Sequence, residues 1–256
     1  MQLETIERPT RPGPWCPHTV HPACQIHQWN DLTFLHWRYD PEQVQRLLPP
    51  GLRVETFDGS AWVAVVPFRM QVTVPHAPTL PWLSHFPETN VRTYVTGPDG
   101  TTGVWFLSLD ASRLGAVAVA RSTYHLPYFW SHMRIGRVGP VMSYASQRRW
   151  PGPRGATCEV AVEIGAPYLP GEATDLEHWL TARWRLFSAT SNGLRHALAD
   201  HPPWPLCHAR VLHLDQDLVV ATGLPQPEGP PLVHWSPGVE VRVGFPRREG
   251  APSPAS

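Results

Sequence analysis

The sequence predicts an α+β domain in which an antiparallel β-barrel or bent sandwich carries a few helices. Short segments rich in β-branched and aromatic residues recur along the chain, and turn signals separate them. Only three segments show a helical start or a helical apolar period. Proline makes up 31 of 256 residues, against a usual ~5%, and stands mostly between the periodic segments, which indicates rigid loops.

Ten segments are expected to form strands, because they alternate or are rich in β-branched residues between turn signals. In chain order they cover residues 32–39, 52–57, 61–74, 89–96, 104–109, 141–149, 156–164, 183–189, 211–222 and 239–245. Asp58-Gly59 is the strongest hairpin signal and lies between the second and third of these segments. Gly97-Pro98-Asp99-Gly100 predicts a further turn before the fifth.

Three helices are expected, from Asp40 onward, over 111–123 and over 175–182. Asp40 followed by Pro41 is typical of a helix start, because aspartate caps the first turn and proline fits the first helical position. The prolines and glycine at 49–51 then end the first helix.

The predicted organisation is an extended proline-rich arm over 1–25, a single domain over 26–246 and a disordered tail over 247–256. An apolar content of 42% is sufficient for a sizeable core. The sequence contains no internal repeat.

Charge and cysteine content limit the classes of partner. The formal net charge is zero and the sequence pI is about 7.3, so nothing indicates binding to nucleic acid or to an anionic membrane. Four irregularly spaced cysteines, no signal peptide and no long apolar run favour a cytoplasmic protein with free thiols. The expected partner is a small-molecule ligand or substrate, and a homo-oligomer stays open.

The chain contains no lysine: all 21 residues of the Lys+Arg count are arginine. No side-chain amine is therefore present to form an imine with a carbonyl compound.

The stretch Arg121–Trp130 combines a cation, an imidazole, two phenols and three large apolar side chains around one proline. A pure core segment would leave its polar groups without partners, and a pure surface loop would expose leucine, phenylalanine and tryptophan. The mixture is typical of a pocket floor, although a core segment followed by a loop also explains it.

The spacing Arg121-x5-Pro127-Tyr128 resembles acetoacetate decarboxylases, in which an arginine is followed at the same distance by Pro-Lys and the lysine forms the Schiff base. Tyr128 stands at the lysine position here. The whole chain resembles more closely a sister group, the uncharacterised YqjF-like proteins (DUF2071). The matching phrases are Gln28–Leu32, His36-Trp37, Leu48–Gly51, Glu88–Tyr94, Ser108–Ala111, Leu126–Tyr128 and Ser236–Val239. This resemblance covers about residues 25–246 and implies a cone-like antiparallel β-barrel with peripheral helices.

Glu88, Asn90, Arg92 and Tyr94 alternate along one predicted strand, so their side chains share one face. Such a face is either solvated or lines a wet cavity. The resemblance favours the cavity, because Glu88 matches in order and approximate spacing a glutamate of the acetoacetate decarboxylase pocket. Burial would raise the pKa of such a glutamate and a nearby arginine would lower it.

Arg121 is the second candidate anchor for a substrate carboxylate, beside Arg92. A structural Arg121 that pairs with Glu88 or with a helix C-terminal carbonyl is the alternative. Tyr124, His125 and Tyr128 are the remaining titratable groups of the stretch. His125 is a candidate acid or base or a satisfied structural residue, and Tyr128 could donate a hydrogen bond to a substrate oxyanion.

Cys16, His18, His21, Cys24 and His27 form a set that zinc accepts chemically, but the spacing is irregular and prolines interrupt it. No metal and no cofactor are therefore expected. The phrases 201–206 and 234–238 are interpreted as loops held by stacking between aromatic residues and proline. The glycine loops, nucleophile elbows and zinc motifs of common enzyme classes are absent from the sequence.

Two functions are consistent with these residues. The first is an enzyme that acts on a small oxo-acid or related carbonyl compound without a Schiff base. Arg121 or Arg92 would hold the carboxylate, Glu88 would act as acid or base, and Tyr128 would polarise the carbonyl. The second is a non-catalytic small-ligand-binding protein on the same fold, and turnover would separate the two.

Overall fold

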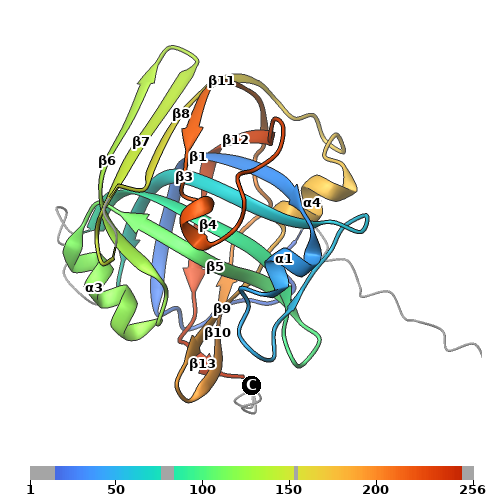
Figure 1. The fold of residues 1–256 in the computed structure, drawn as a ribbon, viewed down its shortest axis with the longest axis vertical. Coiled ribbons are helices and arrows are strands. Elements are labelled where there is room, and N and C mark those ends of the chain that lie inside the picture. The colour runs from blue at the N-terminus through green and yellow to red at the C-terminus, as the bar shows by residue number, and fades with distance from the viewer. Residues whose placement is uncertain (1–14, 76–83, 153–154, 250–256) are drawn as a thin grey trace, which may run out of the picture.

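The structure, a computed structural model, describes residues 15–75, 84–152 and 155–249. Within these residues, thirteen strands form one connected sheet with helices at its periphery (Figure 1). The strands are β1 (Gln25–Tyr39), β2 (Arg53–Val54), β3 (Ala61–Thr73), β4 (His85–Thr96), β5 (Thr102–Ala111), β6 (Tyr128–Val138), β7 (Val141–Trp150), β8 (Thr157–Pro167), β9 (Arg185–Thr190), β10 (Gly193–Asp200), β11 (Cys207–Gln216), β12 (Leu232–Val243) and β13 (Arg247–Arg248). The helices are α1 (Pro41–Gln45), α3 (Leu114–Thr123), α4 (Asp175–Thr181) and a 3₁₀ turn at Val220–Thr222.

Strand pairing closes the sheet into a barrel. Among the described residues, nine strands form a circuit in the order β1-β12-β11-β8-β7-β6-β5-β4-β3, and β3 pairs with β1. All of these pairings are antiparallel except that of β5 with β6. The prediction of an antiparallel barrel with a few peripheral helices is therefore confirmed. None of the helices in the described ranges has the length and apolar character needed to cross a bilayer.

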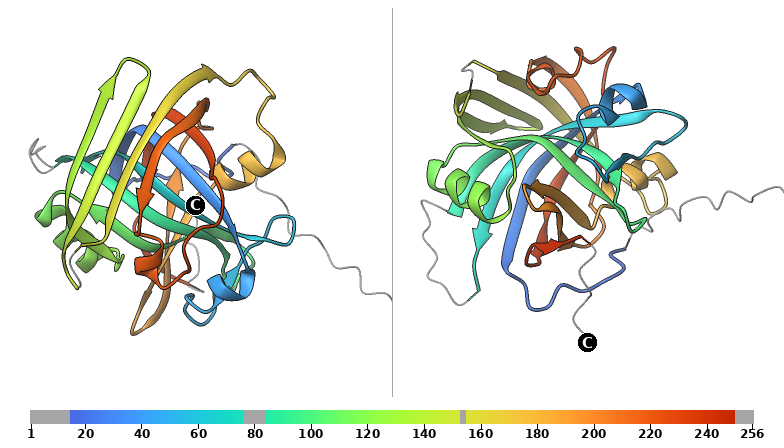
Figure 2. Two further views of the ribbon diagram at one scale, coloured as in Figure 1. Left: turned by 45° about the horizontal axis from the view of Figure 1, so that its top comes forward. Right: turned by 60° about the horizontal axis from the view of Figure 1, so that its bottom comes forward.

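A second circuit shares part of the first. β10 pairs with β12, and β9 pairs in parallel with β5, so that β9 and β10 cover the other face of the β12-β1-β3-β4-β5 wall (Figure 2). Alternate residues of β3 consequently enter two different cores. Ala64, Val66 and Phe68 pack in one core with Ala197 and Ala199 of β10. Val63 and Val65 pack in the other core, which β7, β8 and β11 help to enclose.

The turn at Asp58-Gly59 forms as predicted, but the hairpin around it does not. Both residues have positive φ, 50° and 76°, as a tight primed turn requires, and Phe57 bridges to Ser60. β2, however, pairs with β4 through Arg53 and Thr96 and makes no ladder with β3. The turn residues dictate the reversal, whereas the partner of the preceding strand is a long-range choice.

Three strands lie where the sequence patterns predicted none: β6, β10 and the two-residue β13. The distal half of β6 is largely exposed, so it lacks the apolar alternation on which a strand prediction depends. The strand predicted over 211–222 ends at Gln216, and the chain then forms the 3₁₀ turn before Gly223. The segment 234–238, interpreted as a loop, is part of β12.

The ends of the described chain are attached to β10 and β12. Val20 is buried and its amide donates to the Asp200 carboxylate at 3.2 Å, while β1 begins at Gln25. Residues 1–14 of the predicted arm lie outside the described residues. At the other end, Arg247–Arg248 form β13 against β10, so the predicted disordered tail is corrected at 247–249. The remaining residues, 250–256, lie outside the described ranges.

Helix α1 confirms the predicted cap. The Asp40 carboxylate accepts a hydrogen bond from the Glu42 amide at 2.8 Å, and Pro41 occupies the first helical position. Asp40→Ala should therefore lower the free energy of unfolding by about 1 kcal/mol, because it leaves that amide without its partner. Chemical denaturation measures this, and Asp40→Asn, which retains a capping oxygen, should lose much less.

Candidate functional site

The polar face of β4 is buried in the barrel. Glu88, Asn90, Arg92 and Tyr94 are all less than a tenth exposed, which excludes the solvated interpretation of this face. They lie on the side of the wall that faces β9 and β10, because their neighbours in the adjacent strand include Ala64, which packs there. The second circuit therefore turns an apparently solvent-facing pattern into an interior one.

Glu88 and Tyr128 form a direct pair. Tyr128 begins β6 and lies opposite Leu109 of β5, while Glu88 lies opposite Ala111 of the same strand. The Tyr128 hydroxyl donates a hydrogen bond to the Glu88 carboxyl at 2.9 Å. Both side chains are buried, at 2% and 8% exposure, so the hydrogen bond lies out of contact with bulk water.

Burial raises the pKa of Glu88 to about 8, and the Asp110 carboxylate adds to the rise, while Tyr128 and Asn90 oppose it. At neutral pH the carboxyl is therefore mostly protonated. It can accept from Tyr128 through one oxygen and donate through the other. Burial, followed by the nearby Glu88 and Tyr124, holds the pKa of Tyr128 well above its ordinary value.

Arg92 is a buried cation at the other end of the same face. Its Cζ lies 5.4 Å from the centre of the Phe34 ring and 5.8 Å from that of Tyr94, and a terminal nitrogen is 3.5 Å from the Leu180 carbonyl oxygen. No carboxylate forms an ion pair with Arg92 among the residues that the structure describes. The ring faces stabilise the cation, but its charge stays uncompensated.

Arg121 does not join this interior group. It is exposed at the end of α3, donates to the Tyr128 carbonyl oxygen at 2.7 Å and lies 6.0 Å from the Trp150 ring. The Arg121 side chain therefore anchors the start of β6 from outside the barrel. This is close to the structural alternative, except that Arg121 contacts the carbonyl of Tyr128 and not a carbonyl at a helix C-terminus. His125 is also exposed, in a left-handed conformation with φ of 54°, and the structure does not bring it to Glu88.

Tyr124 is buried near Tyr128 and faces the Cys24 thiol, which together with burial raises the pKa of the phenol. Of the eight candidate residues, the structure thus places six in the barrel interior. These six are Glu88, Asn90, Arg92, Tyr94, Tyr124 and Tyr128.

Sequence reasoning missed two interior histidines. His36 of β1 bonds to the Tyr94 hydroxyl at 2.8 Å, and His234 of β12 bonds to Glu177 of α4 at 2.7 Å. Both are 1% exposed. The alternation of Leu32, Phe34 and His36 along a predicted strand was the available signal for the first. His234 had none, because its segment was interpreted as a loop.

The cluster from Cys16 to His27 is dispersed. The Cys16 thiol donates to the His18 carbonyl oxygen, and His27 bonds to Gln25. Burial lowers the pKa of His27 to about 4. No group of three or more histidine, cysteine, aspartate or glutamate side chains converges on a metal-sized space in the part of the chain that the structure describes.

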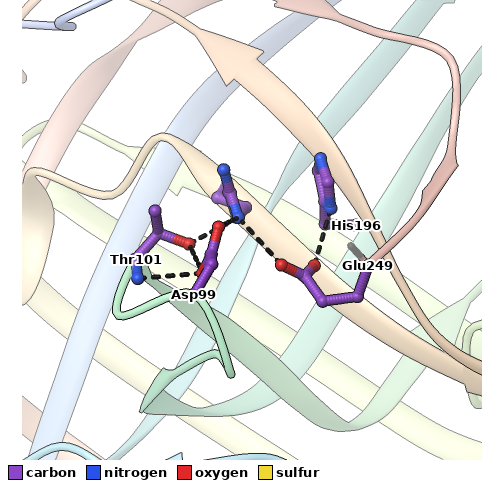
Figure 3. Close-up of polar contacts among 5 residues, drawn as sticks. Asp99, Thr101, His196 and Glu249 are labelled. Carbon is purple, nitrogen blue, oxygen red and sulfur yellow. Dashed lines mark hydrogen bonds and ion pairs between the residues drawn. The ribbon is translucent and has the colours of Figure 1, made fainter. Parts of the chain in front are cut away.

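A second polar network lies at the base of the barrel and is structural. Arg185 at the start of β9 bonds to Asp99 at 3.0 Å and to Thr101, and lies 3.5 Å from Glu249. Figure 3 shows Asp99 and Thr101 on one side of this network and Glu249 with His196 on the other. The network ties the β4–β5 turn to β10 and to the segment after β13.

The doubly closed barrel defines the chain as a protein of the acetoacetate decarboxylase-like fold. An acetoacetate decarboxylase-like enzyme from Sphingomonas wittichii RW1 is similar to it with a TM-score of 0.62 and 14% identity, over 91% of this chain and 99% of that one. The enduracididine biosynthesis enzyme MppR complexed with pyruvate is similar with a TM-score of 0.60 and 15% identity, over 90% and 92%. Identities this low show a shared fold and do not fix a shared function.

The chain belongs to the DUF2071 family, described as an uncharacterized conserved protein, which matches residues 27–240. It is 35% identical over 215 residues to the uncharacterized protein YqjF of Bacillus subtilis (strain 168), which covers 83% of this chain and 87% of that protein.

Proposed function

We propose that this protein acts on a small oxo-acid or related carbonyl compound within the barrel, without Schiff-base chemistry. The observation that carries the proposal is the buried Glu88–Tyr128 pair, whose carboxyl has a pKa of about 8. A buried acid that is protonated at neutral pH can donate to a carbonyl oxygen and take the proton back. The similarity in fold to a protein complexed with pyruvate supports the substrate class.

In this proposal the side chains have separate tasks. Glu88 transfers the proton to and from the substrate oxygen. Tyr128 orients the Glu88 carboxyl and stabilises the negative charge that develops on it. Arg92 holds the substrate carboxylate, since a buried guanidinium without a carboxylate partner favours an anionic ligand. Glu88 and Arg92 are four residues apart on one strand, so their Cα atoms are about 13 Å apart, and Asn90 lies between them on the same face.

The second candidate function is non-catalytic binding of the same class of ligand. The complete absence of lysine favours it, because the side chain that defines the known chemistry of this fold is lost. Turnover decides between the two candidates. An enzyme consumes pyruvate or acetoacetate in an NMR time course, whereas a binding protein raises its melting temperature with the ligand and leaves the ligand unchanged.

Tyr128→Phe should weaken pyruvate binding about tenfold, because the phenol no longer orients the Glu88 carboxyl. Isothermal titration measures the affinity. Tyr39→Phe is the matched control, since its hydroxyl bonds to the Pro225 carbonyl oxygen away from the site. Equal affinities for wild type, Tyr128→Phe and Glu88→Gln would contradict the proposal.

A further inference from the structure

Several buried polar atoms have no hydrogen-bond partner in the described part of the chain, and three nitrogens among them belong to neighbouring strands of one wall of the barrel. They are the Nε of Arg92 and the Nδ1 atoms of His36 and His234. The three residues are 7%, 1% and 1% exposed, so bulk water does not satisfy them. A buried polar group without a partner is costly, and native structures usually supply one. Three such atoms in one region point to a missing polar ligand.

Strand register brings these residues together. His36 of β1 lies opposite Ala64 of β3, and Ala64 lies opposite Arg92 of β4, so the three occupy one row across the sheet. Neighbouring strands are about 4.8 Å apart, which separates the His36 and Arg92 Cα atoms by about 10 Å. Only the Ala64 methyl group lies between them in that row. His234 stands in the next row, opposite Phe34.

The charges of the region favour an anion. The carboxylates of its neighbours already have partners: Glu55 pairs with Arg183 at 2.6 Å, and Glu177 bonds to His234 at 2.7 Å. Burial, Arg92 and His234 hold the pKa of His36 well below its ordinary value, so this histidine is neutral. The Arg92 guanidinium is thus the uncompensated charge, and the same charge disfavours a metal cation between the histidines.

The three nitrogens provide two donors and one acceptor. This set complements a ligand in which a polar group stands next to a carboxylate. Arg92 Nε–H is a donor in every protonation state available to it. If the Tyr94 hydroxyl donates to His36 Nε2, the His36 proton resides on Nδ1 and makes a second donor. His234 donates from Nε2 to the charged Glu177, which leaves its Nδ1 as an acceptor.

A surface cleft leads toward this region. It has a volume of about 770 Å³ and lies beside α4, and its lining includes Tyr168, Trp184 and Trp204. The Trp204 ring packs edge-on against Phe34 at 5.1 Å, and Phe34 is the ring over which Arg92 lies. Trp204 therefore separates the cleft from the uncompensated guanidinium.

We propose that Arg92 and His36 form a small-carboxylate site above Ala64, with His234 as its acceptor, which the ligand enters through the cleft at Trp204. The inference rests on the proposed function only in taking Arg92 as the carboxylate anchor. It adds His36, Ala64 and His234 to the site, and it does not require the Glu88–Tyr128 pair.

Isothermal titration with sodium acetate at constant ionic strength tests the site, because acetate has a carboxylate but no ketone for Glu88 to act on. Wild type should bind acetate. Arg92→Met should bind it at least tenfold more weakly, because it loses a charge-assisted hydrogen bond. Ala64→Val, which adds two methyl groups between His36 and Arg92 and removes no polar group, should show a loss of similar size. Arg210→Met is the matched control, since that arginine is exposed and pairs with Glu163 at the surface.

A second measurement is made on the wild-type protein. The only interior variant it needs is Arg92→Met, which assigns the resonance. In wild-type protein, acetate should shift the NMR resonance of one arginine Nε–H, the one absent from Arg92→Met. The inference is wrong if acetate does not bind, or if it binds but moves no such resonance and is insensitive to Ala64→Val. If acetate binds as expected while pyruvate binding ignores Tyr128, the inference holds and the proposed function fails. If pyruvate binding depends on Tyr128 but acetate binding is unaffected by Ala64→Val, the proposed function holds and the inference fails.

Discussion

Between pH 4.5 and pH 8 the free energy of unfolding of the wild-type protein should decrease, and Glu88→Gln should abolish this decrease. The folded protein holds the Glu88 proton up to about pH 8, whereas an ordinary glutamate releases it near 4.5. Because the folded state binds more protons in this window, the stabilisation is complete below pH 4.5 and is lost as the pH rises through 8. The difference between the two pKa values corresponds to about 5 kcal/mol in total.

Urea denaturation of both proteins from pH 5 to pH 9 measures the effect. The free energy of unfolding of wild type relative to Glu88→Gln should fall by up to about 1.4 kcal/mol per pH unit and become constant above pH 8. Glutamine retains the volume of the side chain and an oxygen that accepts from Tyr128. Glu163→Gln, at an exposed surface pair, should leave the pH profile of wild type unchanged. Parallel profiles for wild type and Glu88→Gln would show that the carboxyl titrates normally.

The parts of the fold that local chemistry dictates were predictable from sequence. The Asp40 cap and the Asp58-Gly59 reversal each depend on a few neighbouring residues, and both form. The partner of β2 was not predictable, because a two-residue strand carries too little pattern to select β4 over β3. β10 was not predicted either, although it forms a tight hairpin with β9, which ends at Thr190; only its pairing with β12 is distant in sequence.

The same distinction between local and long-range determinants applies to the candidate site. Alternation placed Glu88, Asn90, Arg92 and Tyr94 on one face, but only closure by β9 and β10 determines that this face is buried. Arg121 shows the limit of spacing arguments, because its distance along the chain to Tyr128 is unchanged while its guanidinium contacts the outer side of β6. A side chain's direction depends on how α3 packs, and that is not encoded in the spacing.

Tyr128→Lys should convert the barrel interior into a site that forms a trappable imine. Wild type is a suitable reference, since its sequence contains no lysine. Borohydride with pyruvate should therefore leave wild type without an adduct in the 121–130 region. Position 128 is buried, and burial in apolar surroundings lowers the pKa of a lysine by up to several units, which makes the amine nucleophilic near neutral pH.

Glu88 sets how far this pKa falls. A charged Glu88 beside the introduced amine would favour the ammonium form. The protonated Glu88 found near neutral pH only weakly offsets the lowering of the lysine pKa by burial. The double substitution Tyr128→Lys with Glu88→Gln removes the competing carboxylate, so it should be trapped at least as fast, with the larger gain above pH 8. Peptide mass analysis locates the adduct, and Arg210→Lys at the exposed surface should show no comparable trapping. A Tyr128→Lys protein that folds, resists trapping and has an amine titrating near the ordinary ~10.4 would show that position 128 does not correspond to the Schiff-base lysine.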